Sequence, residues 1–179
     1  AFEIGAKALG AHVSYIPGDI GVHEPLEDIG AYLENWYSLL IVRAARHADL
    51  TYLADHTSIP VINARTNISH PCEIMGDLQF IRRHRTSLDG LKVAFVGEVT
   101  NLCMSWMEAA VRFPITVTQI APEEYLATPA LLNGLNATAV GHIQAQALAR
   151  ARRDIFGLQR GRSQPQLATQ QLEPHFIAR

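Results

Sequence analysis

Residues 67–78, which read NISHPCEIMGDL, form the most informative stretch of this sequence. Before it, the apolar run Val61–Asn63 is typical of a short buried strand, and after it apolar residues recur at helical spacing over 74–81. His70 and Glu73 are therefore expected where a strand ends and a helix begins, facing one small volume together with the free N–H groups of the helix. A carbonyl or anionic group bound there would meet an imidazole donor, a carboxyl group and a helix N-terminus.

Strand and helix patterns alternate along most of the remaining chain. The predicted strands are 12–16, 39–42, 61–63, 91–97 and 115–120, and the predicted helices are 2–9, 26–36, 50–54, 71–83 and 101–112. This alternation predicts an α/β fold with mostly parallel sheets. The long helix before Leu91 suggests a boundary near residue 87, which divides the fold into two parallel-sheet α/β units, 1–87 and 88–143.

The last part of the chain, 144–179, differs in composition. It carries seven Gln and six Arg residues against only Asp154 and Glu173, and it contains no convincing strand. The pattern over His142–Phe156 is compatible with a helix, whereas Gln159–Arg179 is expected to be loosely organised.

Bulk properties exclude several classes of protein. Of the 179 residues, 48% are hydrophobic and 18% are charged, which are globular values. A formal net charge of -2 gives no reason to expect nucleic acid or an anionic membrane as a partner. The two cysteines lack metal-type spacing, and no apolar run reaches the ~18 residues of a membrane helix. We therefore expect a cytoplasmic protein in a reducing compartment.

Several motifs, in order over roughly residues 1–125, resemble the aspartate/ornithine carbamoyltransferase family. They are AFEIGAKALGAHV at 1–13, LEDI at 26–29, IVR at 41–43, PVIN at 60–63, HPCE at 70–73 and GLKVAFVG at 90–97. Each motif is weak alone, but their order and spacing together are specific. The His-Pro-Cys form is similar to the ornithine-type members more than to the aspartate-type members, which usually have His-Pro-Thr.

The resemblance implies a carbamoyl-phosphate-binding unit at 1–87 and a partial Rossmann-like amino-acid-binding unit at 88–143. The implied reaction transfers carbamoyl from carbamoyl phosphate to the amine of an amino acid such as ornithine. The resemblance also implies a homotrimer, with the carbamoyl site near a subunit boundary, and no cofactor.

Arg43 and His70 are the predicted catalytic residues. The resemblance places Arg43 at the strand end that carries the arginine polarising the carbamoyl carbonyl. The chemistry agrees, because negative charge grows on that oxygen as an amine attacks, and both side chains can donate hydrogen bonds to it. The alternatives are a surface ion pair for Arg43 and a helix-entry role for His70.

Glu73 and Asn101 are further predicted substrate-binding residues. Glu73 stands where the family usually has a glutamine that holds the carbamoyl amide. A carboxylate there would lie near the phosphate charges and should weaken binding unless it is protonated or paired with Arg43. A helix-capping role is the alternative for Glu73. Asn101 matches the second asparagine of an Asp-Gly-Asn-Asn motif that contacts the amino acid, although Thr100 or Asn101 is equally compatible with an N-cap.

Two family segments are not found in this sequence. It opens directly after the expected position of a Ser-Thr-Arg-Thr-Arg phosphate loop, and no His-Cys-Leu-Pro segment follows residue 125. The chain is therefore either part of a longer enzyme or a degenerate, non-catalytic homologue that acts in binding or assembly. A dinucleotide site over Val93–Asn101 is disfavoured, because the turn lacks the required glycine spacing.

Overall fold

The computed structural model describes residues 1–134, 140–144 and 177–178, and in these ranges helices and strands alternate as expected. The elements before the predicted boundary, called the first unit below, are α1 (Phe2–Ala8), α2 (Leu26–Leu33), β1 (Leu40–Arg43), α3 (His47–Asp55), β2 (Val61–Arg65) and α4 (Pro71–Arg85). The elements after that boundary, called the second unit below, are β3 (Leu91–Val96), α5 (Asn101–Arg112), β4 (Ile115–Ala121), the 3-10 turn η1 (Glu123–Tyr125), α6 (Pro129–Gly134), β5 (Val140–Gln144) and β6 (Ile177–Ala178).

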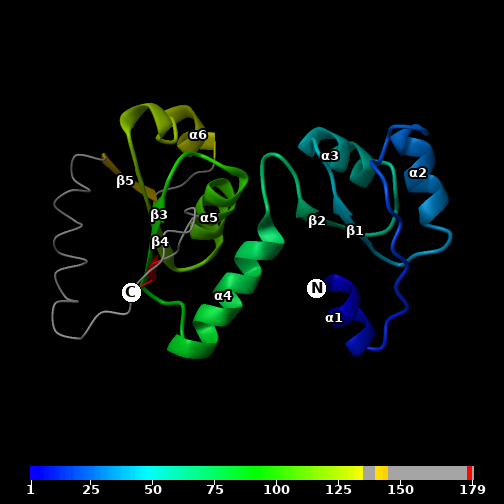
Figure 1. The fold of residues 1–179 in the computed structure, drawn as a ribbon, viewed down its shortest axis with the longest axis horizontal. Coiled ribbons are helices and arrows are strands. Elements are labelled where there is room, and N and C mark those ends of the chain that lie inside the picture. Colours follow the sequence, from blue (N-terminus) through cyan, green and yellow to red (C-terminus); the bar gives the residue numbers. More distant parts are fainter. Residues whose placement is uncertain (135–139, 145–176, 179) are drawn as a thin grey trace, which may run out of the picture.

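The strands form two separate sheets. β1 and β2 pair in parallel, and the second sheet has the order β5-β4-β3-β6. Its β3, β4 and β5 are parallel, whereas the two-residue β6 pairs antiparallel with β3. Helix α4 runs between the two sheets and contacts both β2 and α5 (Figure 1). The predicted α/β fold with two mostly parallel sheets is confirmed.

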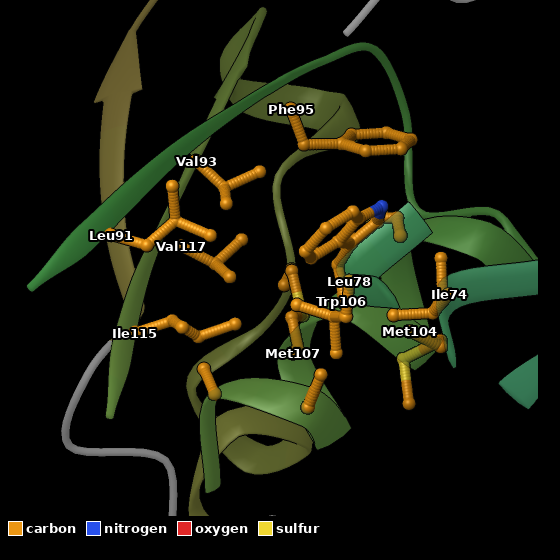
Figure 2. Close-up of a cluster of buried hydrophobic side chains, with 14 residues drawn as sticks. Ile74, Leu78, Leu91, Val93, Phe95, Met104, Trp106, Met107, Ile115 and Val117 are labelled. Carbon is orange, nitrogen blue, oxygen red and sulfur yellow. The ribbon is translucent and has the colours of Figure 1, made fainter. Parts of the chain in front are cut away.

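The main core lies in the second unit, where α5 packs on β3 and β4. Trp106 and Met107 of α5 are completely buried against strand residues such as Leu91 and Val117 (Figure 2). Helix α4 contributes Ile74 and Leu78 to the same cluster, so the helix that follows the first sheet is anchored by the second. This anchoring fixes the position of the N-terminus of α4.

The helix boundaries have local causes. Pro71 occupies the first position of α4, where its missing N–H is not needed. Helix α4 ends at Arg85 because Thr86 adopts a left-handed backbone with φ 67°. In α2, Gly30 is buried against the backbone of His56, and an added Cβ would lie 2.5 Å from that carbonyl oxygen.

Two local predictions are wrong, and a third is contradicted at its start. Residues 12–16 form no strand, because the segment is mostly exposed and no neighbouring strand pairs with it. The pattern assigned to a helix over His142–Phe156 begins inside β5, and its remaining residues lie outside the described ranges. The tail beyond residue 144, in which no strand was expected, contributes β6, whose Ile177 pairs with Ala94.

Candidate functional site

The loop between β2 and α4 is closed by hydrogen bonds between Thr66 and Ser69. The Thr66 N–H donates to the Ser69 carbonyl at 2.8 Å, and the Ser69 N–H donates to Thr66 Oγ1 at 3.1 Å. Both residues are buried, and Ser69 Oγ also accepts a 2.8 Å hydrogen bond from the Asn63 side chain. The loop is therefore a tight turn that delivers His70 to the start of α4.

His70 and Glu73 are in direct contact. The ring atom Nε2 of His70 lies 3.0 Å from Oε2 of Glu73, with 19% of the His70 side chain and 48% of the Glu73 side chain exposed. The other ring nitrogen, Nδ1, is buried and has no hydrogen-bond partner among the described residues. The His70 N–H donates to Oγ of Ser105 on α5 at 2.7 Å. The structure thus brings these two predicted site residues together.

A second carboxyl group lies one turn further along α4. Burial, together with the charge of Glu73, raises the pKa of the Asp77 carboxyl. The N-terminal dipole of α4 favours an anion, but Glu73 and Asp77 oppose one. The electrostatics at this helix start are therefore mixed in sign.

Arg43 is the last residue of β1, and its side chain is exposed. The register between β1 and β2 shifts after Val42, so that Arg43 pairs with Arg65. His70 follows Arg65 by a short loop, which puts Arg43 and His70 at the carboxyl edge of the same parallel sheet. No hydrogen bond joins their side chains in the part of the chain that the structure describes.

Asn101 opens α5, but the N-cap is Thr100, whose Oγ1 accepts a 3.3 Å hydrogen bond from the Cys103 N–H. The Asn101 side chain donates instead to the Thr66 carbonyl at 2.8 Å. Of the two roles expected at this turn, the cap thus belongs to Thr100. The amide of Asn101 ties α5 to the loop that carries His70.

Sequence reasoning missed Ser105. It is 2% exposed in a run of α5 whose neighbours are apolar, and its hydroxyl accepts from the His70 backbone. The signal that could have identified it is a single hydroxyl within the apolar run LCMSWM at 102–107. Ser105 and Asn101 lie one helical turn apart, so one face of α5 holds the loop at two points.

Both cysteines have the surroundings of structural residues. The Cys72 thiol donates to the Asn63 carbonyl at 3.1 Å, and burial raises its pKa. Burial raises the pKa of Cys103 to about 12. Neither thiol is activated as a nucleophile, since the reactive form is the thiolate.

An open hollow of about 350 Å³ lies in the second unit, beyond the carboxyl end of β3. It is lined by Glu98, Val99, Glu124, Tyr125, Leu126, Thr128 and Leu131. Gln119, which is fully buried, holds its rim: the side-chain amide donates to the carbonyls of Gly97 and Tyr125, at 2.9 and 3.0 Å. None of the four predicted site residues lines this hollow, so the β3 turn supplies Glu98 to it but not Asn101.

The described residues include no group of three or more His, Cys, Asp or Glu side chains placed to hold a metal ion. Within the same ranges, every helix is too short or too polar to cross a membrane.

These features define an α/β protein in which polar groups meet at the carboxyl edge of a parallel sheet and at a helix N-terminus, the usual ligand position in such folds. Residues 1–83 match the model of the aspartate/ornithine carbamoyltransferase carbamoyl-P binding domain. The chain belongs to the aspartate/ornithine carbamoyltransferase family.

Individual relatives agree with this assignment. The ornithine carbamoyltransferase of Hydrogenovibrio crunogenus is 34% identical over 135 residues, which are 74% of this chain and 45% of the relative. The structure of ornithine carbamoyltransferase from Thermus thermophilus matches with a TM-score of 0.70 at 30% identity, over 79% of this chain and 50% of that one. The enzyme from Pyrococcus furiosus shares the fold, with a TM-score of 0.73 at 24% identity over 87% and 59% of the two chains. This chain thus spans about half the length of these relatives.

Proposed function

We propose that this chain binds carbamoyl phosphate and contributes to carbamoyl transfer onto the amine of an amino acid, with ornithine as the preferred acceptor class. The observation that carries the proposal is His70, held at the N-terminus of α4 within the stretch that matches a carbamoyl-phosphate-binding domain. The acceptor is suggested by the ornithine carbamoyltransferases among its relatives.

The proposed chemistry needs hydrogen-bond donors at one oxygen. As the amine attacks the carbamoyl carbon, the new C–N bond forms, the bond to the phosphate oxygen breaks, and negative charge grows on the carbonyl oxygen. Arg43 supplies a permanent positive charge, and His70 supplies an N–H. In this proposal both act on the carbonyl, Asn101 lies near the amino acid, and no cofactor takes part.

We also propose a homotrimer in which the carbamoyl site lies near a subunit boundary. Closed symmetry is the usual outcome for homo-oligomers. Exposed apolar side chains on α1 and the segment after it support an association, since Ile4, Leu9 and Tyr15 are each more than three-quarters exposed. A cytoplasmic location, expected from composition, stays a prediction.

A second candidate is a non-catalytic homologue that keeps the fold and serves in binding or assembly. Glu73 favours it, because a carboxylate occupies the position where the family usually has glutamine. Both candidates allow carbamoyl phosphate to bind, so turnover distinguishes them.

Calorimetric titration of the 179-residue chain with carbamoyl phosphate tests the binding step. Arg43→Ala and His70→Gln should each weaken binding at least about tenfold, the equivalent of roughly 1.4 kcal/mol. The exposed residues Arg83 and His84 at the far end of α4 provide matched controls, and Arg83→Ala and His84→Gln should leave the affinity unchanged. Binding without carbamoyl transfer to ornithine would favour the second candidate, and no binding would reject the proposal.

A further inference from the structure

The contact between His70 and Glu73 requires a proton at a particular atom. Nε2 and Oε2 lie 3.0 Å apart, within the range of an N–H donor and its acceptor. An ionised carboxylate has only acceptor oxygens, and a bare imidazole nitrogen has only a lone pair. Two lone pairs facing each other at this distance would repel, so a neutral ring has to carry its hydrogen on Nε2.

Within the described ranges, the second ring nitrogen is unpaired in either neutral form of the ring. Nδ1 of His70 is buried and has no hydrogen-bond partner among the described residues. A hydrogen on Nδ1 would be a buried donor without an acceptor, and a bare Nδ1 is a buried acceptor without a donor; either costs roughly 1–3 kcal/mol, so this atom does not distinguish the two forms. The Nδ1–H form adds the repulsion between Nε2 and Glu73 to this shared cost, whereas the Nε2–H form replaces the repulsion with a hydrogen bond, so the contact with Glu73 decides between them.

The backbone around the pair is held in place. The His70 N–H is bonded to Ser105 at 2.7 Å, and the Glu73 N–H donates to the His70 carbonyl at 3.2 Å. Pro71 further restricts the chain between them, since its ring fixes φ. The two side chains consequently start from fixed Cα positions three residues apart in the first turn of α4.

We propose that Glu73 is a positioning residue for His70: it keeps the neutral imidazole in the Nε2–H form and gives up this contact when a ligand carbonyl oxygen replaces it. The inference rests on the proposed function, because it describes how the same site receives the carbonyl of carbamoyl phosphate. It differs from the expectation that Glu73 itself holds the carbamoyl amide. Glu73 is half exposed, so its side chain has room to move aside.

The first test needs no ligand. Nitrogen-15 NMR of the 179-residue chain, at a pH where the ring of His70 is neutral, reports which ring nitrogen carries the hydrogen. His70 is assigned by the signals that disappear in His70→Gln. We expect Nε2–H in the parent, a mixture of both forms in Glu73→Ala, and the Nε2–H form again in Glu73→Gln, whose side-chain oxygen still accepts.

Asp77→Asn is the matched control, since it removes a carboxylate from the same helix one turn further on and should leave the His70 signals unchanged. A helix-capping role for Glu73 would alter stability without changing the ring nitrogens. An Nδ1–H ring in the parent would overturn the positioning role, as would identical His70 signals in the parent and Glu73→Ala.

The second test adds carbamoyl phosphate to the labelled parent and to Glu73→Gln. We expect the ligand to shift the His70 Nε2 signal and to bind Glu73→Gln at least as tightly as the parent, because an amide competes less strongly than a carboxylate for an N–H. Tenfold weaker binding to Glu73→Gln would reject the displacement step. No binding to either protein would reject that step and the proposed function, while the ligand-free spectra still decide the positioning role.

Discussion

The backbone N–H of His70 donates a 2.7 Å hydrogen bond to the hydroxyl of Ser105, which belongs to a helix of the second unit. A residue of the candidate site is thereby held by a side chain that lies 35 positions later in the sequence. Ser105 is 2% exposed, so water cannot easily replace its hydroxyl as the acceptor of this hydrogen bond.

We expect Ser105→Ala to lower the free energy of unfolding by roughly 1–3 kcal/mol, because the His70 N–H would lose its acceptor. Urea unfolding followed by circular dichroism measures the change. Ser14→Ala, at an exposed position, is the control and should have little effect. Equal stability of the two variants would argue that the hydrogen bond contributes nothing.

The proposed function predicts that Arg43→Ala lowers catalytic efficiency far more than stability. Loss of a charge that acts on the developing oxyanion typically costs about 2–4 kcal/mol of transition-state stabilisation. Steady-state kinetics with carbamoyl phosphate and ornithine measure this loss. A comparable loss in Arg83→Ala, an exposed residue at the end of α4, would show that the effect is not specific.

Two helical glycines should respond to alanine with opposite signs. Gly30→Ala would place a Cβ 2.5 Å from the His56 carbonyl oxygen, so α2 and the end of α3 have to separate and stability should fall by more than about 1 kcal/mol. Gly76→Ala in α4 meets no atom within 4 Å and should raise stability by up to about 1 kcal/mol through helix propensity. Thermal unfolding of both variants checks the pair, and a gain in both would contradict the close packing at Gly30.

The partly buried carboxyl group of Glu108 should make the stability of the fold depend on pH. Burial raises the pKa of this carboxyl, and the nearby His47 acts in the opposite direction. The folded pKa lies above the unfolded value of about 4.3, so the ionised form opposes folding, and stability falls as pH rises between the two values.

Glu108→Gln should therefore be more stable than the parent at pH near 7 and lose this advantage at pH near 3, where the carboxyl group is largely protonated in both the folded and the unfolded parent. The gain should stay below about 1 kcal/mol, since the group is partly exposed and screened by solvent. Urea unfolding at both values measures it, with the exposed Glu124→Gln as control. A parent that is more stable than Glu108→Gln at neutral pH would contradict this prediction.

Local patterns predicted most of the fold because hydrophobic periodicity and capping signals are short-range. The helix Asn101–Arg112 was predicted with its observed bounds. The strand predicted over 91–97 is observed as Leu91–Val96, so only its last residue differs. Strand pairing is not a local property. His12–Ile16 alternates like a strand but has no partner, whereas the short Ile177–Ala178 forms a strand because β3 offers a free edge.

The candidate site was predictable only in its residue types. His70 and Glu73 follow from the strand–helix junction and from the family motif, but their mutual contact depends on side-chain rotamers within the first turn of α4. Ser105 acts through a long-range hydrogen bond that no local pattern encodes. The roles of Arg43 and Asn101 toward substrates stay predictions, as does the boundary near residue 87.

Two hydrogen bonds from α5 hold the loop between β2 and α4, so the first unit alone does not supply all the contacts that position this loop. Asn101 satisfies the Thr66 carbonyl and Ser105 satisfies the His70 amide, and both lie beyond the predicted boundary. A fragment ending near residue 87 would retain β1, β2 and α4 but leave these two backbone groups unpaired. The geometry of the candidate site therefore depends on side chains of the second unit, and evolutionary or engineered exchange of that unit would have to preserve both of them.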